Sequence, residues 1–322
     1  MILVTGGFGS IGAHTALALA DLGEHVVVTR HRKAAPPAFL EGRVAVEQAD
    51  LADLDALRAI GARHQITGIV HLAAVALEEP DAIAFMRRNT AMLLNALDVA
   101  RTWRVRRFAV ASSIGVYIGT PGPRWHEDLA LVPATSPNSI LAFKKSVEAI
   151  TPQVLQGTGV EPIKLRIGTI WGPLGLPDSP FFPIPRLISA TVRGEAPDLT
   201  PPRPPGFADD GGDRCYVKDC GRAIALLMRA DTLQHDTYNI SSGQPVANHE
   251  FVTAINAAVP GAEASLRPGR NPDAPADDPY LDTTRLVQDT GFEPAFDVRA
   301  GVADYVAWLQ NNPFRRRIVE KL

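Results

Sequence analysis

Glycines at positions 6, 9 and 12 follow a short apolar run, in the sequence TGGFGSIG at positions 5–12. Gly6 permits a tight turn, Gly9 lets the backbone approach a phosphate, and Gly12 allows a helix to pack closely on a strand. A helix that begins here presents free N–H groups and the positive end of its dipole. The spacing therefore predicts a loop that binds the pyrophosphate of an NAD-type dinucleotide, with these ligands: Gly6, Gly9, Ser10, Ile11 and Gly12.

The end of the next expected strand indicates which dinucleotide binds. An NAD-binding unit usually carries Asp or Glu there, which binds the ribose 2′-hydroxyl. This chain has Thr29 at that position, followed by Arg30 and Arg32. Guanidinium groups bind phosphate through several hydrogen bonds, so the pattern favours NADP(H) over NAD(H). The alternative is that both arginines are solvated loop charges.

The elements that must position this loop alternate between strands and helices, which is typical of a parallel sheet built from βαβ units. The strands lack polar alternation, as expected when helices cover both faces. We therefore expect an α/β fold, a doubly wound parallel Rossmann sheet whose ligand crevice lies at the carboxyl ends of the strands. The expected strands are 2–5, 25–29, 44–47, 68–72, 107–111 and 162–167, and the expected helices are 11–22, 53–64, 80–103 and 137–155.

The composition changes after Gly172, where a stretch rich in proline and glycine begins. Residues 173–212 are interpreted as a surface loop or lid, and a PxxP ligand for a partner is the alternative. A strand-like 214–217, a helix at 219–229 and a strand at 238–240 then return to the sheet pattern, and two helices follow at 249–258 and 298–309. We expect a dinucleotide-binding domain of residues 1–172 plus about 213–241. A smaller substrate-binding domain comprises 173–212 plus about 242–322.

The composition bounds the class of protein. Hydrophobic residues make up 46% and charged residues 21% of 322, and the net charge is −3. These values favour a globular protein with no nucleic-acid partner and no membrane span, and the cytoplasm is the expected compartment. Two cysteines, Cys215 and Cys220, are too few for a disulfide framework and are interpreted as packing thiols. The eight histidines are scattered, so no metal site is expected.

Further landmarks along the chain resemble those of the extended short-chain dehydrogenase/reductases, the group that includes NAD-dependent epimerases and dehydratases. The glycine loop resembles their TGGxGxIG, and SSIGVY at 112–117 resembles SSxxVY. Lys144 with Glu148 resembles the end of YxxxKxxxE, and Leu165-Arg166 and later segments follow in the family's order. The resemblance implies cofactor contacts from Asp50 and Leu51 at the adenine, from Leu72, Ala73 and Ala74 after His71, and from Asn89 in the long helix. Asp50, Asn89 and His71 also have structural interpretations: a turn residue, a buried helix residue and a core histidine.

The chemistry that the resemblance implies needs a tyrosine and a lysine one helical turn apart, with the lysine lowering the pKa of the phenol. Lys144 is present, but Ile140 occupies the tyrosine position, and the chain has no tyrosine between Tyr117 and Tyr216. Ser113 would still polarise a substrate oxygen, and Lys144 would still bind the cofactor ribose. The proton carrier is then Tyr117, with His126, Glu127 or a water chain ending on Lys144 as alternatives. A purely structural interpretation is that Tyr117 is a packing residue.

Two departures bear on the substrate. Where many nucleotide-sugar members carry a phosphate-binding asparagine and arginine, this chain has Thr169 and Gly212. Arg214 and Arg186 are candidates to substitute, so the predicted substrate-binding residues are Ser113, Thr169, Arg186 and Arg214. The absence of these two phosphate-binding residues favours a small apolar or aromatic carbonyl compound as the substrate. The residues that would line its pocket, or equally form core, are Phe181, Phe182, Ile184 and Leu187.

The leading functional prediction is an NADP(H)-dependent oxidoreductase that acts on a carbonyl or hydroxyl of a small molecule. The first alternative is a non-catalytic NADP(H)-binding sensor or scaffold that kept the site and lost the acid. The second is a nucleotide-sugar epimerase or dehydratase. The two long helices also suggest a homodimer, with these interface candidates: Ala84, Met92, Leu93, Val147 and Ile150.

Overall fold

A seven-stranded parallel sheet forms the centre of the computed structural model, which describes residues 1–31, 35–75, 81–133, 138–179, 181–201, 203–274 and 276–312. The strand order is β10-β7-β5-β4-β1-β2-β3. The predicted α/β class with a doubly wound parallel sheet is confirmed. The strands are β1 (Ile2–Thr5), β2 (Val26–Arg30), β3 (Ala45–Gln48), β4 (Gly68–His71), β5 (Arg107–Ala111), β7 (Glu161–Ile167) and β10 (Thr237–Ile240).

The strands at the middle of the sheet are buried along their whole length. Every residue of β1, β4 and β5 is buried, which explains their unbroken apolar character. Val4 pairs with Val28 on β2 and with Val70 on β4, so the three strands end at nearly the same level. All the loops that follow these strands therefore meet at one edge of the sheet.

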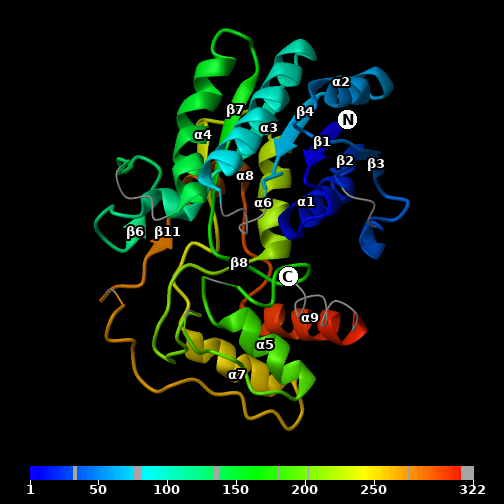
Figure 1. Cartoon of the computed structure of the whole chain (residues 1–322). Helices are drawn as coiled ribbons and strands as arrows, with labels where there is room; N and C mark the ends of the chain where they lie inside the picture. Colours follow the sequence, from blue (N-terminus) through cyan, green and yellow to red (C-terminus); the bar gives the residue numbers. More distant parts are fainter. Residues whose placement is uncertain are drawn as a thin grey trace.

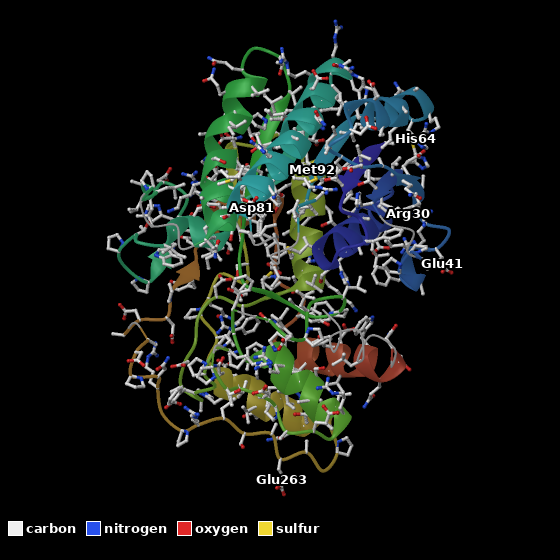
Figure 2. The ribbon with its side chains drawn as sticks, viewed as in Figure 1. Arg30, Glu41, His64, Asp81, Met92 and Glu263 are labelled. Carbon is white, nitrogen blue, oxygen red and sulfur yellow. The ribbon has the colours of Figure 1, made fainter. Side chains whose placement is uncertain are left out.

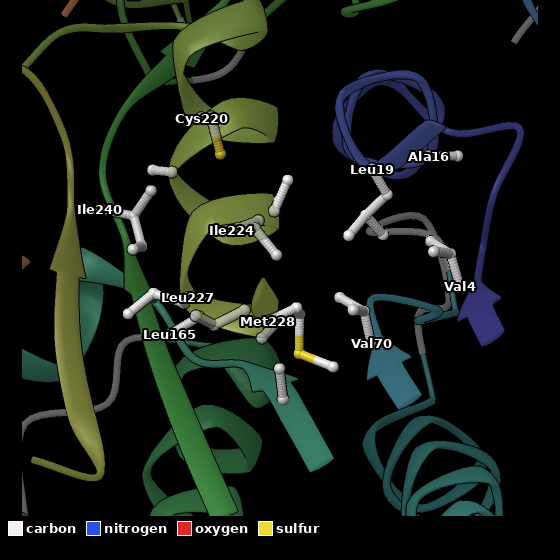
Figure 3. Close-up of a cluster of buried hydrophobic side chains, with 14 of the residues drawn as sticks. Val4, Ala16, Leu19, Val70, Leu165, Cys220, Ile224, Leu227, Met228 and Ile240 are labelled. Atoms are coloured by element: carbon white, nitrogen blue, oxygen red, sulfur yellow. The ribbon is translucent and has the colours of Figure 1, made fainter. Parts of the chain in front are cut away.

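Two layers of helices cover the sheet (Figure 1). One face packs against α1 (Ser10–Asp21), α6 (Val217–Arg229) and α8 (Thr284–Thr290), and the other against α2 (Leu54–Arg63), α3 (Ala82–Thr102) and α4 (Ser139–Leu155). Figure 3 shows Leu19 of α1 and Ile224 and Met228 of α6 packed over the strands. Gly221 lets α6 approach α1, because a Cβ there would lie 2.6 Å from the His14 backbone.

A smaller layer of helices lies beyond the carboxyl ends of the strands (Figure 1). It consists of α5 (Ile184–Arg193), α7 (Asn248–Ala258) and α9 (Val298–Asn311), which share a buried apolar cluster. The interpretation of 173–212 as a surface loop or lid is wrong for α5, most of which is buried. Pro185 in its first turn and Gly194 at φ 70 in its C-cap start and end this helix.

Short elements connect the two layers. β8 (Ile170–Trp171) pairs with β9 (Cys215–Tyr216), and β6 (Arg124–Trp125) pairs with β11 (Tyr280–Leu281). The expected strand 214–217 is thus a two-residue strand outside the central sheet, and α6 begins at Val217. Sequence periodicity also missed α8 and the 3-10 turns η1 (Ala38–Leu40) and η2 (Ile114–Tyr117).

Both cysteines are free and buried, which confirms their interpretation as packing thiols. No helix among the described residues is long and apolar enough to cross a bilayer. Of the predicted dimer residues, Met92, Leu93 and Val147 are buried in the core and Ala84 and Ile150 are half-buried. The first three are therefore wrong as interface residues. The large apolar side chains that α3 exposes are instead Ile83 and Leu94.

Candidate functional site

The glycine loop connects β1 to α1 and is shaped by contacts that exclude side chains. Gly6 has φ +68, and a Cβ there would meet the Ala73 backbone at 3.0 Å. A Cβ on Gly12 would lie 2.3 Å from the Gly6 carbonyl oxygen, and one on Gly7 would lie 2.4 Å from Val28 Cβ. Gly9 differs, because it is exposed and its added Cβ would meet only Gly6 O at 3.3 Å. Gly9 therefore faces the open side of the loop, beside the first turn of α1.

The first turn of α1 supplies the other predicted loop ligands. Ser10 and Ile11 are half-buried, and their N–H groups belong to the turn that has no intrahelical acceptor. The Ser10 hydroxyl donates to the Pro173 carbonyl at 2.8 Å, which ties the loop to the chain after β8. A Cβ on Gly9 would begin to fill the cradle that these groups form. The cradle thus fits the pyrophosphate of a dinucleotide.

The segment after β4 lies directly against the glycine loop. The Thr5 hydroxyl accepts hydrogen bonds from the backbone N–H of Leu72 at 3.1 Å and of Ala73 at 3.3 Å, and it lies 3.0 Å from His71 Nδ1. Burial and the charge of Lys144 lower the pKa of His71 to about 3, so its ring is neutral at physiological pH. His71 is thus a satisfied core histidine, while Ala74 is exposed at the crevice.

The end of β2 holds the loop through its threonine. Thr29 is buried, and its hydroxyl accepts from Gly6 N at 3.2 Å. The outermost residue of β2 is Arg30, which is half-buried and labelled in Figure 2. Arg32 lies outside the described residues.

Asp50 follows β3 at the same edge. Its carboxylate accepts from Ala52 N at 3.0 Å, and it lies 3.4 Å from Arg88 Nη2 and 3.6 Å from His31 Nε2. Both the turn interpretation and an exposed acid at the crevice edge are compatible with this geometry. Two cationic or protonatable side chains, Arg88 of α3 and His31 after β2, therefore lie beside this half-buried carboxylate.

Asn89 lies on α3, and Leu51 is hydrogen-bonded by another side chain of the same helix. The Asn89 amide donates to Phe85 O at 2.9 Å and its oxygen accepts from Val75 N at 3.1 Å, so it ties α3 to the chain after β4. Leu51 is buried, and its carbonyl accepts from the Asn95 amide at 3.0 Å. Both residues thus support the crevice wall through buried or half-buried contacts, and direct cofactor contact by either stays a prediction.

Ser113 follows the carboxyl end of β5, and Lys144 reaches the last residue of that strand. Ser113 is half-buried and caps η2 by accepting from Gly115 N at 3.1 Å. Lys144 on α4 donates to Ala111 O at 2.5 Å, and burial lowers its pKa to about 8. Ile140, one turn earlier on α4, packs against the apolar cluster that contains Phe85 and Phe143. A serine, a lysine and an apolar wall therefore share this corner of the crevice.

Tyr117 does not occupy the position expected of a proton carrier. Its side chain is fully buried, and its hydroxyl donates to Asn239 Oδ1 at 2.9 Å and accepts from Arg166 Nη1 at 2.8 Å. Burial raises its pKa to about 12. The expectation that Tyr117 transfers the proton is corrected, because its hydroxyl is enclosed in a core network with the guanidinium 4.8 Å from its ring.

Glu127, a second candidate for proton transfer, is also buried in this network. Arg166 pairs with Glu148 of α4 at 2.6 Å, and Glu148 also accepts from Ser112 Oγ at 2.5 Å. Glu127 accepts from Asn239 N at 2.8 Å, and burial raises its pKa. His126 is exposed in the loop. Glu148 thus fixes α4, one turn beyond Lys144, against the strand end that carries Ser113.

The predicted substrate residues separate into different places. The Thr169 backbone N–H donates to the buried Asp213 carboxylate at 3.0 Å. Arg186 is buried in an ion pair with Asp178. Arg214 lies with its guanidinium 4.5 Å from the Phe182 ring. Of the four apolar pocket candidates, Phe182, Ile184 and Leu187 are core and Phe181 is 68% exposed.

Sequence reasoning missed Asp213 as a structural centre. Its carboxylate accepts from Thr169 N and from Leu281 N at 3.1 Å, and burial raises its pKa. Asp213 lies just before β9, and its carboxylate therefore connects the chain after β7 to β11. The only sequence signal was an acidic residue between Gly212 and Arg214, and nothing local distinguishes it from a solvated turn residue.

Comparison with known proteins fits this geometry. The profile of the NAD dependent epimerase/dehydratase family matches residues 2–241, and the chain belongs to that family. A probable UDP-glucuronate 4-epimerase of Rhizobium meliloti (strain 1021) is 28% identical over 362 residues, covering 98% of each chain. A UDP-glucuronic acid 4-epimerase from Bacillus cereus in complex with NAD has a TM-score of 0.77 at 20% identity, covering 96% of this chain and 98% of that one. MoeE5 in complex with UDP-glucuronic acid and NAD has a TM-score of 0.75 at 25% identity, covering 97% and 99%.

Proposed function

We propose that this protein is an enzyme that binds a nicotinamide dinucleotide and acts on a nucleotide-linked sugar as an epimerase or dehydratase. The sequence favoured a small carbonyl compound. The named relatives support the nucleotide-sugar alternative better, because proteins similar over nearly the whole chain include UDP-glucuronate 4-epimerases. The glycine cradle at α1 supports the cofactor half of the proposal.

The observation that carries the catalytic half is the half-buried Lys144, whose Nζ donates to Ala111 O, two residues before Ser113. Burial lowers the pKa of Lys144 to about 8, so about a tenth of its amine is neutral at pH 7 and able to accept a proton. Ile140 has no proton to give, and the Tyr117 hydroxyl is enclosed. Lys144 is therefore the proton acceptor in this proposal.

The roles of the residues follow from their positions. The bound nicotinamide would supply the hydride acceptor for the carbon that bears the substrate hydroxyl. Ser113 hydrogen-bonds the substrate oxygen, and Lys144 takes the proton that this oxygen loses. The N–H groups of the first turn of α1 hold the cofactor phosphates. In this way Lys144 combines ribose binding with the proton transfer expected of the absent tyrosine.

The preference for NADP(H) over NAD(H) forms part of the proposal. Position 29 is a threonine and not a carboxylate, Arg30 ends β2, and Arg88 and His31 lie 3.4 and 3.6 Å from Asp50. A 2′-phosphate would meet net positive charge there. The similar structures named above hold NAD, which supports the opposite preference. Titration of the protein with NADPH and NADH decides between them, and equal or tighter NADH binding would contradict the preference.

Incubation with either oxidised cofactor and a panel of UDP-sugars tests the function. We expect an epimeric or dehydrated sugar product, separated by chromatography, and reduced turnover in Lys144→Met. A second candidate function, a non-catalytic cofactor-binding sensor, is favoured by the apolar packing of Ile140. Tight cofactor binding with no product from any sugar, and a partner protein that distinguishes the two oxidation states, would support the sensor instead.

A further inference from the structure

Leu174 lies in the tight loop that follows β8, and its backbone has a left-handed conformation. Its φ is +63, and the loop also contains Gly172, at φ +127, and Gly175. Among the described residues, Leu174 and Arg104 are the two with positive φ that are not glycine. This conformation costs free energy for any side chain with a Cβ, and most for bulky ones. The loop therefore holds a leucine where glycine would be unstrained.

The positive φ of Arg104 has an ordinary explanation that does not apply to Leu174. Arg104 comes directly after Trp103, the C-cap of α3, and the residue just beyond a C-cap commonly adopts this conformation. Leu174 instead lies between β8 and α5, and none of the described helices ends there. Strain in such a loop persists only where the surrounding contacts impose it, and it occurs most often at ligand sites.

The contacts that hold the loop come from the proposed cofactor cradle. The Ser10 hydroxyl, in the first turn of α1, donates to the Pro173 carbonyl at 2.8 Å. The turn is closed by Gly175 N, which donates to Gly172 O at 3.1 Å, and a Cβ on Gly175 would lie 4.0 Å from Ser10 Oγ. Both neighbours of Leu174 are thus held beside the first turn of α1.

The Leu174 side chain lies at the border of the same cradle. It is half-buried and packs against the apolar cluster that Phe8 and Ile11 also contact. Phe8 belongs to the glycine loop, and Ile11 belongs to the first turn of α1. Leu176, two residues further along, differs because it is 54% exposed. The strained residue is therefore the leucine of this loop that packs with the cradle.

We propose that Leu174 is a positioning residue that covers the bound dinucleotide where it crosses the first turn of α1. A glycine would relieve the strain but would leave this side of the cradle open to water. An apolar side chain over the cofactor excludes water and so strengthens the hydrogen bonds beneath it. The inference rests on the proposed dinucleotide binding, and it adds the residue that slows the release of the cofactor.

The rate of cofactor release provides the test. Dissociation of NADPH and of NADH is followed by nicotinamide fluorescence after mixing with an excess of the matching oxidised cofactor. Leu174→Gly should release the cofactor about tenfold faster than the wild type, because it removes on the order of 50 Å² of apolar contact. Leu174→Met retains an apolar side chain of similar volume and should release the cofactor at the wild-type rate.

Thermal unfolding separates a covering role from a purely structural one. The midpoint of Leu174→Gly should stay near that of the wild type, because relief of the backbone strain offsets the lost packing. If the glycine variant fails to fold, Leu174→Asn replaces it, since asparagine tolerates positive φ and lacks the apolar side chain. A lower midpoint with unchanged dissociation would assign Leu174 to the fold alone and overturn the proposal.

Two further variants serve as matched controls. Leu176→Gly removes the exposed leucine of the same loop and should leave dissociation unchanged. Arg104→Gly relieves the same kind of strain in the turn after α3, so it should raise the thermal midpoint and leave dissociation unchanged. Equally fast release from Leu174→Gly and Leu176→Gly, or from Leu174→Gly and Leu174→Met, overturns the proposal.

The same measurements distinguish this inference from the proposed function. Wild-type protein that binds neither NADPH nor NADH contradicts both. Cofactor binding with the same dissociation rate in the wild type and in Leu174→Gly contradicts the covering role alone and leaves the proposed function intact.

Discussion

The glycine loop and the Ser113–Lys144 corner lie at the same edge of one sheet, yet they differ in how they are specified. In the loop, backbone contacts fix the residue types: Gly6 needs positive φ, and Gly12 has no room for a Cβ. At the corner, Ile140 packs against an apolar cluster one helical turn before Lys144, and no backbone contact of this kind among the described residues fixes either residue type. The glycine positions are thus enforced by sterics, whereas the proposed proton-transfer corner is built from side-chain contacts.

The largest effect on stability and cofactor binding should come from a substitution in the glycine loop, where there is no room for a side chain. Gly12→Ala places a Cβ 2.3 Å from Gly6 O and should destabilise the protein by about 3 kcal/mol, with loss of cofactor binding. Gly9→Ala is the control, because Gly9 has φ −71 and its Cβ would meet only Gly6 O, at 3.3 Å. It should keep its thermal midpoint and weaken only cofactor binding. Equal stability of the two variants would contradict the steric assignment.

Lys144 provides the largest expected effect at the catalytic corner. Lys144→Met should lower turnover by about 10²–10⁴-fold, the usual contribution of a positioned acid or base. Lys145→Met, one residue on along α4, should retain activity, since Lys145 contacts the Val132 carbonyl. The neutral amine is the reactive form, so wild-type turnover should rise with pH and level off above about 8. A flat profile between pH 6 and 9, or equal loss in both variants, would remove Lys144 as the base.

A tyrosine restored at position 140 tests the same corner in the opposite direction. Ile140→Tyr should raise turnover by about tenfold, because the phenol would supply a donor one turn before Lys144. Ile140→Phe adds the same ring without the hydroxyl and controls for altered packing against Phe85 and Phe143. Identical rates in the two variants would show that a hydroxyl here is not used.

The sequence specified the sheet and the loop because their signals are local. Strands 2–5 and 107–111 were predicted with their observed bounds, since fully buried parallel strands carry unbroken apolar runs. The helix α5 was missed because flanking prolines favoured a loop. The network that encloses Tyr117 joins Arg166 of β7 and Asn239 of β10, contacts that only the folded sheet creates. Position in a motif therefore located Tyr117 near the crevice but did not reveal which way its hydroxyl points.

The smallest effect on turnover should come from Tyr117, whose role is structural. Tyr117→Phe leaves Asn239 Oδ1 and Arg166 Nη1 short of a buried partner, so it should lower the free energy of unfolding by about 1–3 kcal/mol. Tyr280→Phe, at a half-buried position, is the control and should change stability little. Denaturant unfolding and kcat are measured on the same preparations. A Tyr117→Phe variant with normal stability and a hundredfold lower kcat would return the tyrosine to the reaction, because a purely structural residue loses folding energy together with rate.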